Sequence, residues 1–367
     1  MPSRQSLWTA SALVAAAGVA VIYFIPSPID PDPVSLGDSL PRLEGPLSVN
    51  THLQRLEKLF EGQIIGPESF AAGSDGEERY HNKYYFYVIG SYELEPECGR
   101  PKGMKVDSSG RLVVADAYNG ILRIDVDSGE TEVLVDRFNG SRFLFLNALD
   151  IASDGTIYFS DSSTKWERRD YRYEVIETNK LGRVLALSPQ SKEVRIVQDG
   201  LYLPNGLSLS EDENFLLVAE MSVSRISRIY LKGPRANSVE VLTENLPGYP
   251  DNIKRNSRGN YYVGMGSVRF QGSSPIGSFL DLVGPYPPIK RFITKIVPAS
   301  LFDVFLPKHA MLLEMDEEGN IVTSHHDPGA LVVRAVSEAF EHSGKIYIGH
   351  FKIPYIGVIK KSIFVSE

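Results

Sequence analysis

The sequence predicts an all-β fold, a six-bladed β-propeller, and three observations support this prediction. The composition favours short strands and turns over long helices, with 31 glycines, 23 prolines, 18 tyrosines and 17 phenylalanines among 367 residues. Apolar residues alternate with polar ones over most of the chain. The pattern of alternation, polar turn and alternation also recurs six times along the sequence.

The repeat appears when the segments are aligned on one turn residue. In chain order, this residue is Gly76, Gly110, Gly155, Glu213, Gly259 and Gly344. The copies cover roughly 310 residues, or about 50 residues each, which suits one four-stranded sheet per copy. Because such a sheet cannot bury both faces alone, radial stacking into a propeller is expected. A β-sandwich is the alternative fold, less favoured because its strands need no common register over six units.

The N-terminus is predicted to carry a transmembrane signal anchor. Residues 7–25 contain no charge and follow a short end, 1–6, that contains Arg4. A helix of this length can span a bilayer. The positive-inside rule leaves residues 1–6 cytoplasmic and the rest lumenal or extracellular, at the endoplasmic reticulum or the plasma membrane. A cleaved signal peptide is the alternative, since Ala15 and Ala17 form a small-x-small pattern inside the apolar run.

The segments after the anchor follow from hydrophobic periodicity. Residues 26–62 are expected to form a stalk and a short helix that ends at Gly62, with Leu53, Leu56 and Leu59 on one face. Residues 63–367 are assigned to the propeller. A lid-like insertion at 266–308 breaks the repeat with an amphipathic helical pattern, which would cover the channel, rest on the bilayer or simply pack on the propeller.

Composition and motifs exclude several classes of protein. The chain has 46 acidic and 38 basic residues and a net charge of −8, so nucleic acid is not an expected partner. The single cysteine, Cys98, excludes an intrachain disulfide and a zinc site built on paired thiolates. Motifs for serine hydrolases, zincins and phosphate loops are absent from the sequence. The sequon at Asn139 predicts N-glycosylation in a surface turn.

The repeat register predicts a polar ring in the central channel. Counting eight residues back from each turn gives Glu68, Lys102, Asn147, Asn205, Asp251 and Val336. Equivalent positions of innermost strands surround the axis of a propeller, so four oxygen-bearing side chains would converge there, with Asn252 beside them. Two carboxylates and two amides are typical of a Ca²⁺ site. The alternative is that Asn and Asp are simply good turn formers.

Five ordered motifs resemble the strictosidine synthase-like family. They are GPESFA, LNALDI, FSDSSTKWERRDY, LPNGLSLS and GYPDNI, within a match from about Leu43 to the end. The family is similar to the six-bladed propellers of paraoxonases and gluconolactonases, which are calcium-dependent hydrolases. The resemblance implies that Glu68, Asn147, Asn205 and Asp251 match calcium ligands, with Asn252 as a further ligand.

Departures from the family patterns are equally informative. Arg334 or Val333 stands where strictosidine synthase has its catalytic glutamate, which argues against condensation of an amine with an aldehyde. Lys102 and Ala117 stand where paraoxonases have a histidine pair. Lys102 also adds a cation to the ring, where it would weaken Ca²⁺ binding by repulsion.

The expected function is therefore a membrane-anchored, Ca²⁺-dependent hydrolase of small esters or lactones, arylesterase-like in activity. Asp251 or Glu68 would act as nucleophile or general base beside the metal. His309 and His350 flank late strands and are further candidates to approach the channel. The alternatives are a non-catalytic propeller that binds a ligand or a membrane protein around a structural ion, and, less favoured, a strictosidine synthase-type enzyme.

Overall fold

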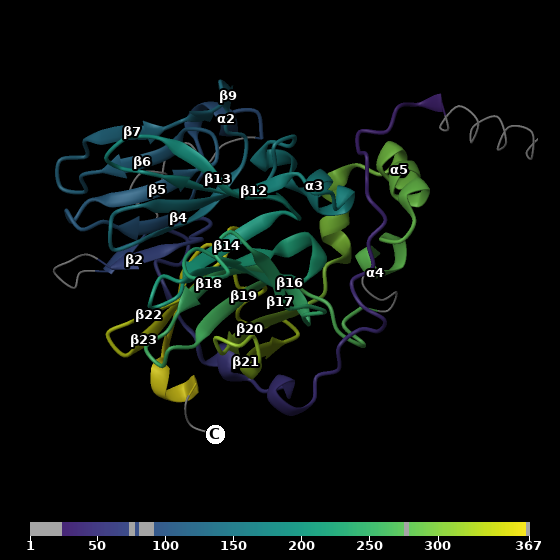
Figure 1. Cartoon of the computed structure of the whole chain (residues 1–367). Coiled ribbons are helices and arrows are strands. Elements are labelled where there is room, and N and C mark those ends of the chain that lie inside the picture. The colour runs from purple at the N-terminus through teal and green to yellow at the C-terminus, as the bar shows by residue number, and fades with distance from the viewer. Residues whose placement is uncertain (1–23, 73–77, 81–91, 275–278, 365–367) are drawn as a thin grey trace, which may run out of the picture.

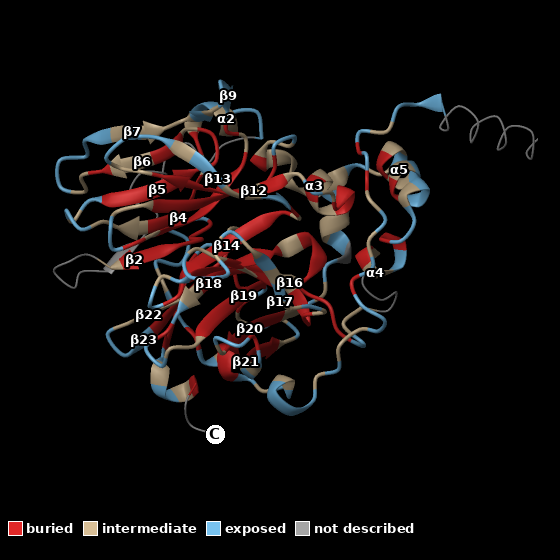
Figure 2. Cartoon of the chain, viewed as in Figure 1, coloured by how far each residue is buried: buried red, intermediate tan, exposed pale blue. Residues whose placement is uncertain are grey.

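The protein is an all-β propeller built from antiparallel sheets (Figure 1). The computed structural model describes residues 24–72, 78–80, 92–274 and 279–364. Within these ranges the chain forms five four-stranded and two two-stranded sheets. Strands of neighbouring blades pack against one another, so most inner strands are buried (Figure 2).

Four sheets consist of consecutive strands. They are β4 (Pro101–Val106), β5 (Leu112–Asp116), β6 (Gly120–Ile124) and β7 (Thr131–Val135); β10 (Leu146–Ile151), β11 (Ile157–Asp161), β12 (Gly182–Leu187) and β13 (Val194–Leu201); β14 (Pro204–Leu209), β15 (Phe215–Glu220), β16 (Arg225–Tyr230) and β17 (Val239–Thr243); and β18 (Gly248–Arg255), β19 (Tyr261–Val268), β20 (His309–Met315) and β21 (Ile321–Pro328). The fifth contains β22 (Glu338–His342), β23 (Lys345–Gly349), β24 (Ile356–Lys360) and β1 (Glu57–Leu59). The two-stranded sheets are β2 (Phe70–Ala72) with β3 (Glu78–Tyr80), and β8 (Arg137–Phe138) with β9 (Ser141–Arg142).

The innermost strands form a closed ring. Strands β2, β4, β10, β14, β18 and β22 each pack against the next, and β22 packs against β2. Five places in this ring belong to four-stranded blades, and the β2–β3 sheet takes the remaining place. The expectation of a propeller is confirmed, and its described part contains five four-stranded blades.

The turn residues of the repeat join the first and second strands of successive blades. Gly110 and Gly155 have φ values of 81° and 87°, which glycine adopts without a steric penalty. Glu213 adopts a φ of 56° at the same position. Its carboxylate accepts a hydrogen bond from the Ser153 hydroxyl at 3.0 Å, which ties this turn to the neighbouring blade. Gly76 lies outside the described residues.

The predicted short helix before Gly62 is wrong for residues 57–59, which form strand β1 instead. Two 3₁₀ turns, Gly45–Leu47 and His52–Arg55, precede this strand. Lys58 pairs with Gly357, so β1 is the outermost strand of the last blade. Leu56 packs over Gly357, which has no side chain to obstruct it. Tertiary pairing has therefore overridden a local helical spacing of leucines.

The predicted anchor lies almost entirely outside the described residues, which begin at Phe24. Among the described residues, no helix combines the length and apolar character needed to cross a bilayer.

The lid-like insertion is a set of short helices between β19 and β20. It contains α4 (Phe279–Val283), α5 (Pro287–Ile296) and a 3₁₀ helix at Ala299–Phe305. Strand β19 extends to Val268, so the insertion begins slightly later than position 266. The N-terminal segment runs beside α4 and α5 (Figure 1), with the Val34 N–H donating to the Gly284 carbonyl at 3.0 Å.

Four histidines form two pairs near the place where the N-terminal segment meets β21, and all but the partly exposed His309 are buried. His52 Nδ1 lies 2.9 Å from His325 Nδ1, and His309 Nε2 lies 2.8 Å from His326 Nδ1. Each pair needs one neutral ring that accepts a hydrogen bond. Burial, followed by the neighbouring histidines, lowers the pKa of His325 and of His326 to about 3. These histidines must therefore be neutral in the folded protein.

We expect the free energy of unfolding to fall as the pH drops below neutrality because of these pairs. A histidine whose pKa in the folded protein is below its unfolded value of about 6.5 contributes to the free energy of unfolding, and this contribution is complete above about pH 6.5. The contribution is lost as the pH falls from about 6.5 toward 3, by up to about 1.4 kcal/mol per pH unit for each histidine. Denaturant titration between pH 7 and 5 should show a shallower pH slope for His326→Gln than for the wild type. His342→Gln, on the last blade, is the control. Equal slopes for the wild type and His326→Gln would contradict the assignment.

Candidate functional site

A cavity of about 520 Å³ opens at one end of the ring. Five of the six ring positions line it, namely Glu68, Lys102, Asn147, Asn205 and Asp251. Val336 does not line the cavity because it is fully buried in a hydrophobic cluster, and its neighbours Arg334 and Ala335 line it instead. Asn252 is also outside the lining set. Its backbone N–H donates to the Ser337 carbonyl, and its Cα lies against Gly206.

A repeated irregularity in strand pairing marks the ring positions. In four blades the register between the first and second strands shifts across the ring residue. The shifts lie between Pro101 and Met104, Leu146 and Leu149, Pro204 and Leu207, and Pro250 and Ile253. A bulge bends the strand and re-aims side chains. The same local distortion therefore places one residue from each of four blades in the cavity.

Two serines of β11 and its end connect adjacent ring residues. The Ser162 hydroxyl accepts a hydrogen bond from Asn147 Nδ2 at 3.0 Å and donates to the Pro204 carbonyl at 2.7 Å. Ser160 Oγ accepts from the Ala148 N–H at 2.9 Å and donates to the Asn205 carbonyl at 2.7 Å. These bonds fix the Asn147 amide and hold the β10 and β14 blades in register at the site.

Glu338 positions the Glu68 segment from the neighbouring blade. Its carboxylate accepts hydrogen bonds from the Ser69 hydroxyl at 2.9 Å and from the Phe70 N–H at 2.8 Å. Glu338 begins β22, whereas Glu68 precedes β2. The ring is thus also fastened where the first innermost strand meets the last.

The ring holds two carboxylates and one ammonium with opposed electrostatic effects. Lys102 Nζ forms a buried ion pair with Glu68. Burial alone would raise the pKa of Glu68, but the positive charge of Lys102, with help from Arg100 and Arg168, holds it well below its usual range. Burial and the negative charge of Glu68 raise the pKa of Asp251. Within the ring, Lys102 pairs with Glu68, and the raised pKa of Asp251 indicates that an added cation would stabilise its ionised form.

Three ring oxygens are buried and have no hydrogen-bond partner among the described residues: Glu68 Oε2, Asn205 Oδ1 and Asp251 Oδ1. Buried acceptors normally have partners, and an unmet set in a cavity fits a hard cation. The described residues contain no cluster of three or more His, Cys, Asp or Glu side chains suited to a metal. An ion here would be held by two carboxylates together with amide oxygens.

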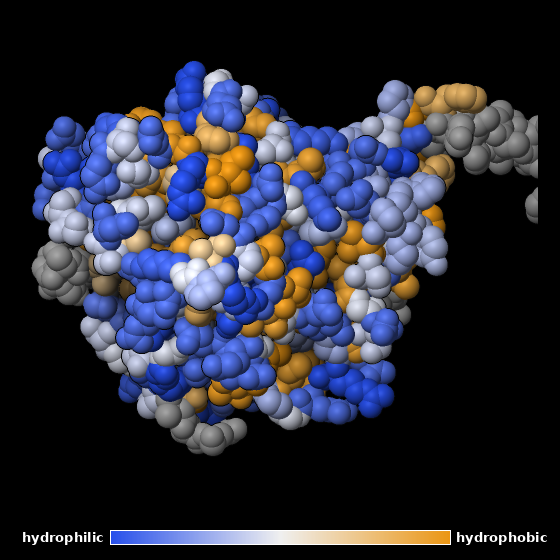
Figure 3. Space-filling view, viewed as in Figure 1, coloured by the Kyte–Doolittle hydropathy of each residue, from blue (hydrophilic) through white to orange (hydrophobic). Residues whose placement is uncertain are grey.

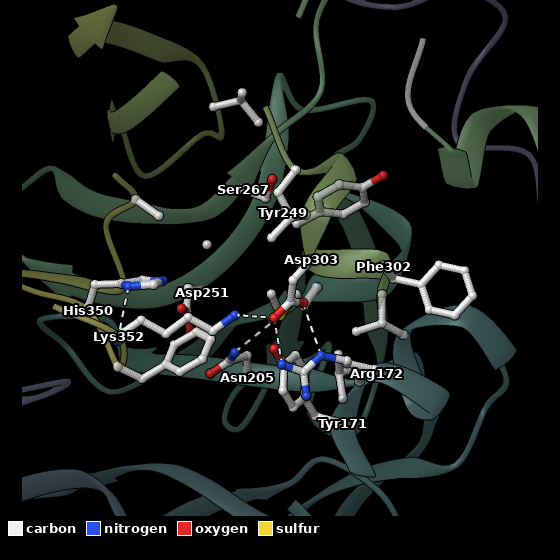
Figure 4. A pocket seen from close by; sticks show the side chains of 18 of the residues that line it. Tyr171, Arg172, Asn205, Tyr249, Asp251, Ser267, Phe302, Asp303, His350 and Lys352 are labelled. Carbon is white, nitrogen blue, oxygen red and sulfur yellow. Dashed lines mark hydrogen bonds and ion pairs between the residues drawn. The ribbon is translucent and has the colours of Figure 1, made fainter. Parts of the chain in front are cut away.

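An ion-pair network closes part of the cavity mouth (Figure 4). Asp303 belongs to the 3₁₀ helix of the insertion. It binds Arg172 of α3 (Tyr171–Glu177) through contacts of 3.0 and 2.6 Å, and Lys352 at 2.6 Å. The insertion also contributes apolar lining residues, among them Phe279 and Phe302. The wall is consequently apolar around a polar floor, an arrangement that suits a small ligand with an apolar body.

Of the four further positions considered from the sequence, His350 and Arg334 line the cavity, whereas His309 and Val333 do not. His350 lines the cavity, and burial lowers its pKa to about 3, so it is neutral. His309 does not line it and pairs with His326. Arg334 lines the cavity, whereas its neighbour Val333 is fully buried in a hydrophobic cluster. Sequence reasoning missed the Asp303 network, because nothing in the local pattern links positions 172, 303 and 352.

The site defines a β-propeller with an oxygen-rich ring beneath a helical insertion, and comparisons with known proteins agree with this class. The sequence profile of strictosidine synthase matches residues 147–234, and that of the strictosidine synthase-like N-terminal region matches residues 45–77. A gluconolactonase from Xanthomonas campestris is 17% identical, with a TM-score of 0.56 over 92% of this chain and 96% of its own. The calcium-binding protein regucalcin from Agrobacterium tumefaciens is 11% identical, with a TM-score of 0.50 over 82% of this chain and 92% of its own. These two structures support the fold.

Curated relatives narrow the class further. Adipocyte plasma membrane-associated protein from Gallus gallus is 39% identical over 96% of this chain and 89% of its own length. The Homo sapiens protein of that name is 37% identical over 92% of this chain and 85% of its own. Protein strictosidine synthase-like 10 from Arabidopsis thaliana is 34% identical over 82% of this chain and 78% of its own. The chain belongs to the adipocyte plasma membrane-associated protein family, within the strictosidine synthase-like group.

Proposed function

We propose that this protein is a membrane-anchored, Ca²⁺-dependent hydrolase of small esters or lactones, with an arylesterase-like activity. The observation that carries the proposal is the set of unpartnered, buried oxygens of Glu68, Asn205 and Asp251 on the floor of an apolar cavity. Two proteins of similar fold, a gluconolactonase and a calcium-binding regucalcin, support the same chemistry.

In this proposal Glu68, Asn147, Asn205 and Asp251 hold the ion. A bound Ca²⁺ would supply a Lewis acid that polarises the carbonyl oxygen of an ester or lactone. Asn252 would support Asp251 through the backbone rather than bind the ion, because it does not line the cavity.

The chain's own residues would orient the substrate and move the proton. Apolar walls, including Phe302 and Phe351, would bind its organic part and exclude bulk water. The Asp251 carboxylate has a raised pKa, which suits a general base that takes a proton from the attacking water. Water adds to the carbonyl carbon, the C–O bond to the alcohol breaks, and the proton passes to the leaving oxygen. Glu68 is less suited to this role because Lys102 already neutralises it.

Assays of phenyl acetate and lactone hydrolysis test this function. The rate is measured as proton release, once with Ca²⁺ and once with EDTA. We expect turnover of at least one substrate with Ca²⁺ and a loss of at least about tenfold with EDTA. The melting temperature should also fall with EDTA, because an ion that binds only the folded ring stabilises it. An unchanged melting curve together with no turnover would refute the proposal.

A second candidate is a binding propeller without catalysis, in which the rim engages a ligand or a membrane protein. The Lys102–Glu68 pair favours it, because the ring already contains a cation of its own. A folded protein that binds Ca²⁺ but hydrolyses neither substrate would support this candidate over the first.

The remaining features of the proposal concern architecture and topology. We propose that β2–β3 is the inner half of a sixth blade, because it fills the remaining place in the ring. Residues 7–25 would anchor a type II protein whose propeller faces the lumen or the outside, at the endoplasmic reticulum or the plasma membrane. Asn139, exposed in the β8–β9 turn, would then be available for glycosylation.

A further inference from the structure

Helix α5 is amphipathic in the opposite sense from a helix that covers a core. Its Lys290 is fully buried, and the ammonium lies 3.2 Å from the Glu177 carbonyl and 3.4 Å from the Asp32 carbonyl. Ile289, Phe292 and Ile296, at a spacing that places them on one helical face, are instead 38 to 47% exposed. The helix therefore turns a lysine inward and large apolar side chains outward.

Neighbouring parts of the insertion also expose apolar side chains. Leu282 lies within α4, between the buried Leu280 and Val283, and Tyr286 precedes α5; Leu282 and Tyr286 are each 55% exposed. Leu301 and Val304 of the 3₁₀ helix are 49 and 73% exposed. Apolar side chains also reach the surface along the edge where α4 and α5 lie (Figure 3). We define these exposed residues, with the three of α5, as the insertion face.

The N-terminal segment around Asp30 lies beside α5 and indicates which partner covers the insertion face. The predicted anchor ends at Ile25, and Asp30 binds Arg291 of α5. Five residues span at most roughly 18 Å. A helix about 10 Å wide and a headgroup layer of about 5 to 7 Å nearly fill that span. With the anchor proposed above in a bilayer, α5 must lie at the bilayer surface.

Acidic residues of the insertion do not oppose this placement. Its two acids between positions 279 and 306 are Asp281, which pairs with Arg269, and Asp303, which pairs with Arg172 and Lys352. Their charges are neutralised within the protein, so they would repel lipid phosphates little.

We propose that the insertion face docks on the phospholipid surface of the membrane that holds the anchor. Leu306 is both 38% exposed and part of the cavity lining, so the rim of the cavity adjoins this face. Lipophilic ligands would then reach the cavity from the bilayer. The docking itself rests on the anchor and on α5, and does not depend on hydrolysis.

Depth-dependent quenching in vesicles tests the docking. The full chain with Cys98→Ser and Phe292→Cys would carry an environment-sensitive fluorophore at position 292, in phosphatidylcholine and phosphatidylserine vesicles containing doxyl lipids. Val133→Cys, on β7, is the matched control because Val133 is also an exposed apolar residue, 53% exposed. Trp8 lies within the predicted anchor, and in a Trp166→Phe background its fluorescence reports insertion of the anchor.

We expect several-fold stronger quenching at position 292 than at 133, greatest for lipids labelled near the headgroup, with Trp8 also quenched. A label at position 306 should be quenched as well. An unquenched label at position 292 overturns the proposal, whether or not Trp8 is quenched. Protection of position 292 from water without lipid quenching would instead indicate a second copy of the chain on this face, and also overturns it. None of these readouts involves ester hydrolysis, so failure of the proposed enzyme activity remains distinguishable.

Discussion

Asp251→Asn is expected to abolish ester hydrolysis and to weaken Ca²⁺ binding strongly. The variant keeps the size of a side chain that is 2% exposed, but removes one of the two carboxylates of the ring. It removes both a charged ligand and the proposed base. We expect a loss of about 10³-fold or more in kcat/KM, since a base and an electrostatic partner each contribute on that scale. Initial rates and calorimetric Ca²⁺ titration would measure the two effects.

Asp161→Asn is the matched control for this variant. Asp161 is also a fully buried carboxylate, and burial raises its pKa to about 6, but it pairs with Arg183 and does not line the cavity. The control should lose stability without losing activity per folded molecule. Equal activity of Asp251→Asn and the wild type would remove Asp251 from the reaction.

Lys102→Met is expected to tighten Ca²⁺ binding and to destabilise the metal-free protein. The ammonium lies within the buried ring and competes with an added cation for Glu68. Its removal leaves Glu68 as an unpaired buried charge, which costs about 3 to 5 kcal/mol until a cation neutralises it. The melting temperature should therefore fall without Ca²⁺ and recover when Ca²⁺ is added. Calorimetry should show at least about tenfold tighter binding, because a repulsive charge at close range has been removed.

Lys105→Met separates this effect from a general loss of positive charge. Lys105 lies on the same strand, β4, and pairs with Asp150, but its side chain is 44% exposed and does not line the cavity. It should change neither Ca²⁺ affinity nor the size of the Ca²⁺-dependent melting shift. Unchanged or weaker Ca²⁺ binding in Lys102→Met would mean that no ion binds beside Glu68.

The repeat register in the sequence predicts five of the residues that line the cavity. Glu68 and Asp251 are far apart in sequence, yet both precede the same turn by the same number of residues. Equivalent strands place equivalent residues at the axis, so counting along the repeat identifies neighbours without any contact information. The count failed at Val336, where Arg334 and Ala335 line the cavity instead.

Features that depend on non-repeated contacts could not be predicted in this way. Residues 57–59 have helical spacing but pair with β24, and this strand lies far away in the sequence, so no local pattern reveals the pairing. The ion pairs of Asp303 with Arg172 and Lys352 join three segments that share no periodicity. The inward orientation of Lys290 was also hidden, because an amphipathic pattern does not state which face meets the protein.

The pairing of Glu57 with Val358 has a consequence for biosynthesis. The last blade lacks its outermost strand until both segments have left the ribosome, and 301 residues separate the two partners. At about 5 to 20 residues per second, translation needs roughly 15 to 60 s to cover that interval. During this interval β1 has no β24 to pair with. The last blade therefore closes only once β24 has been synthesised, and truncated products that end before β24 would leave the edge of that blade unpaired.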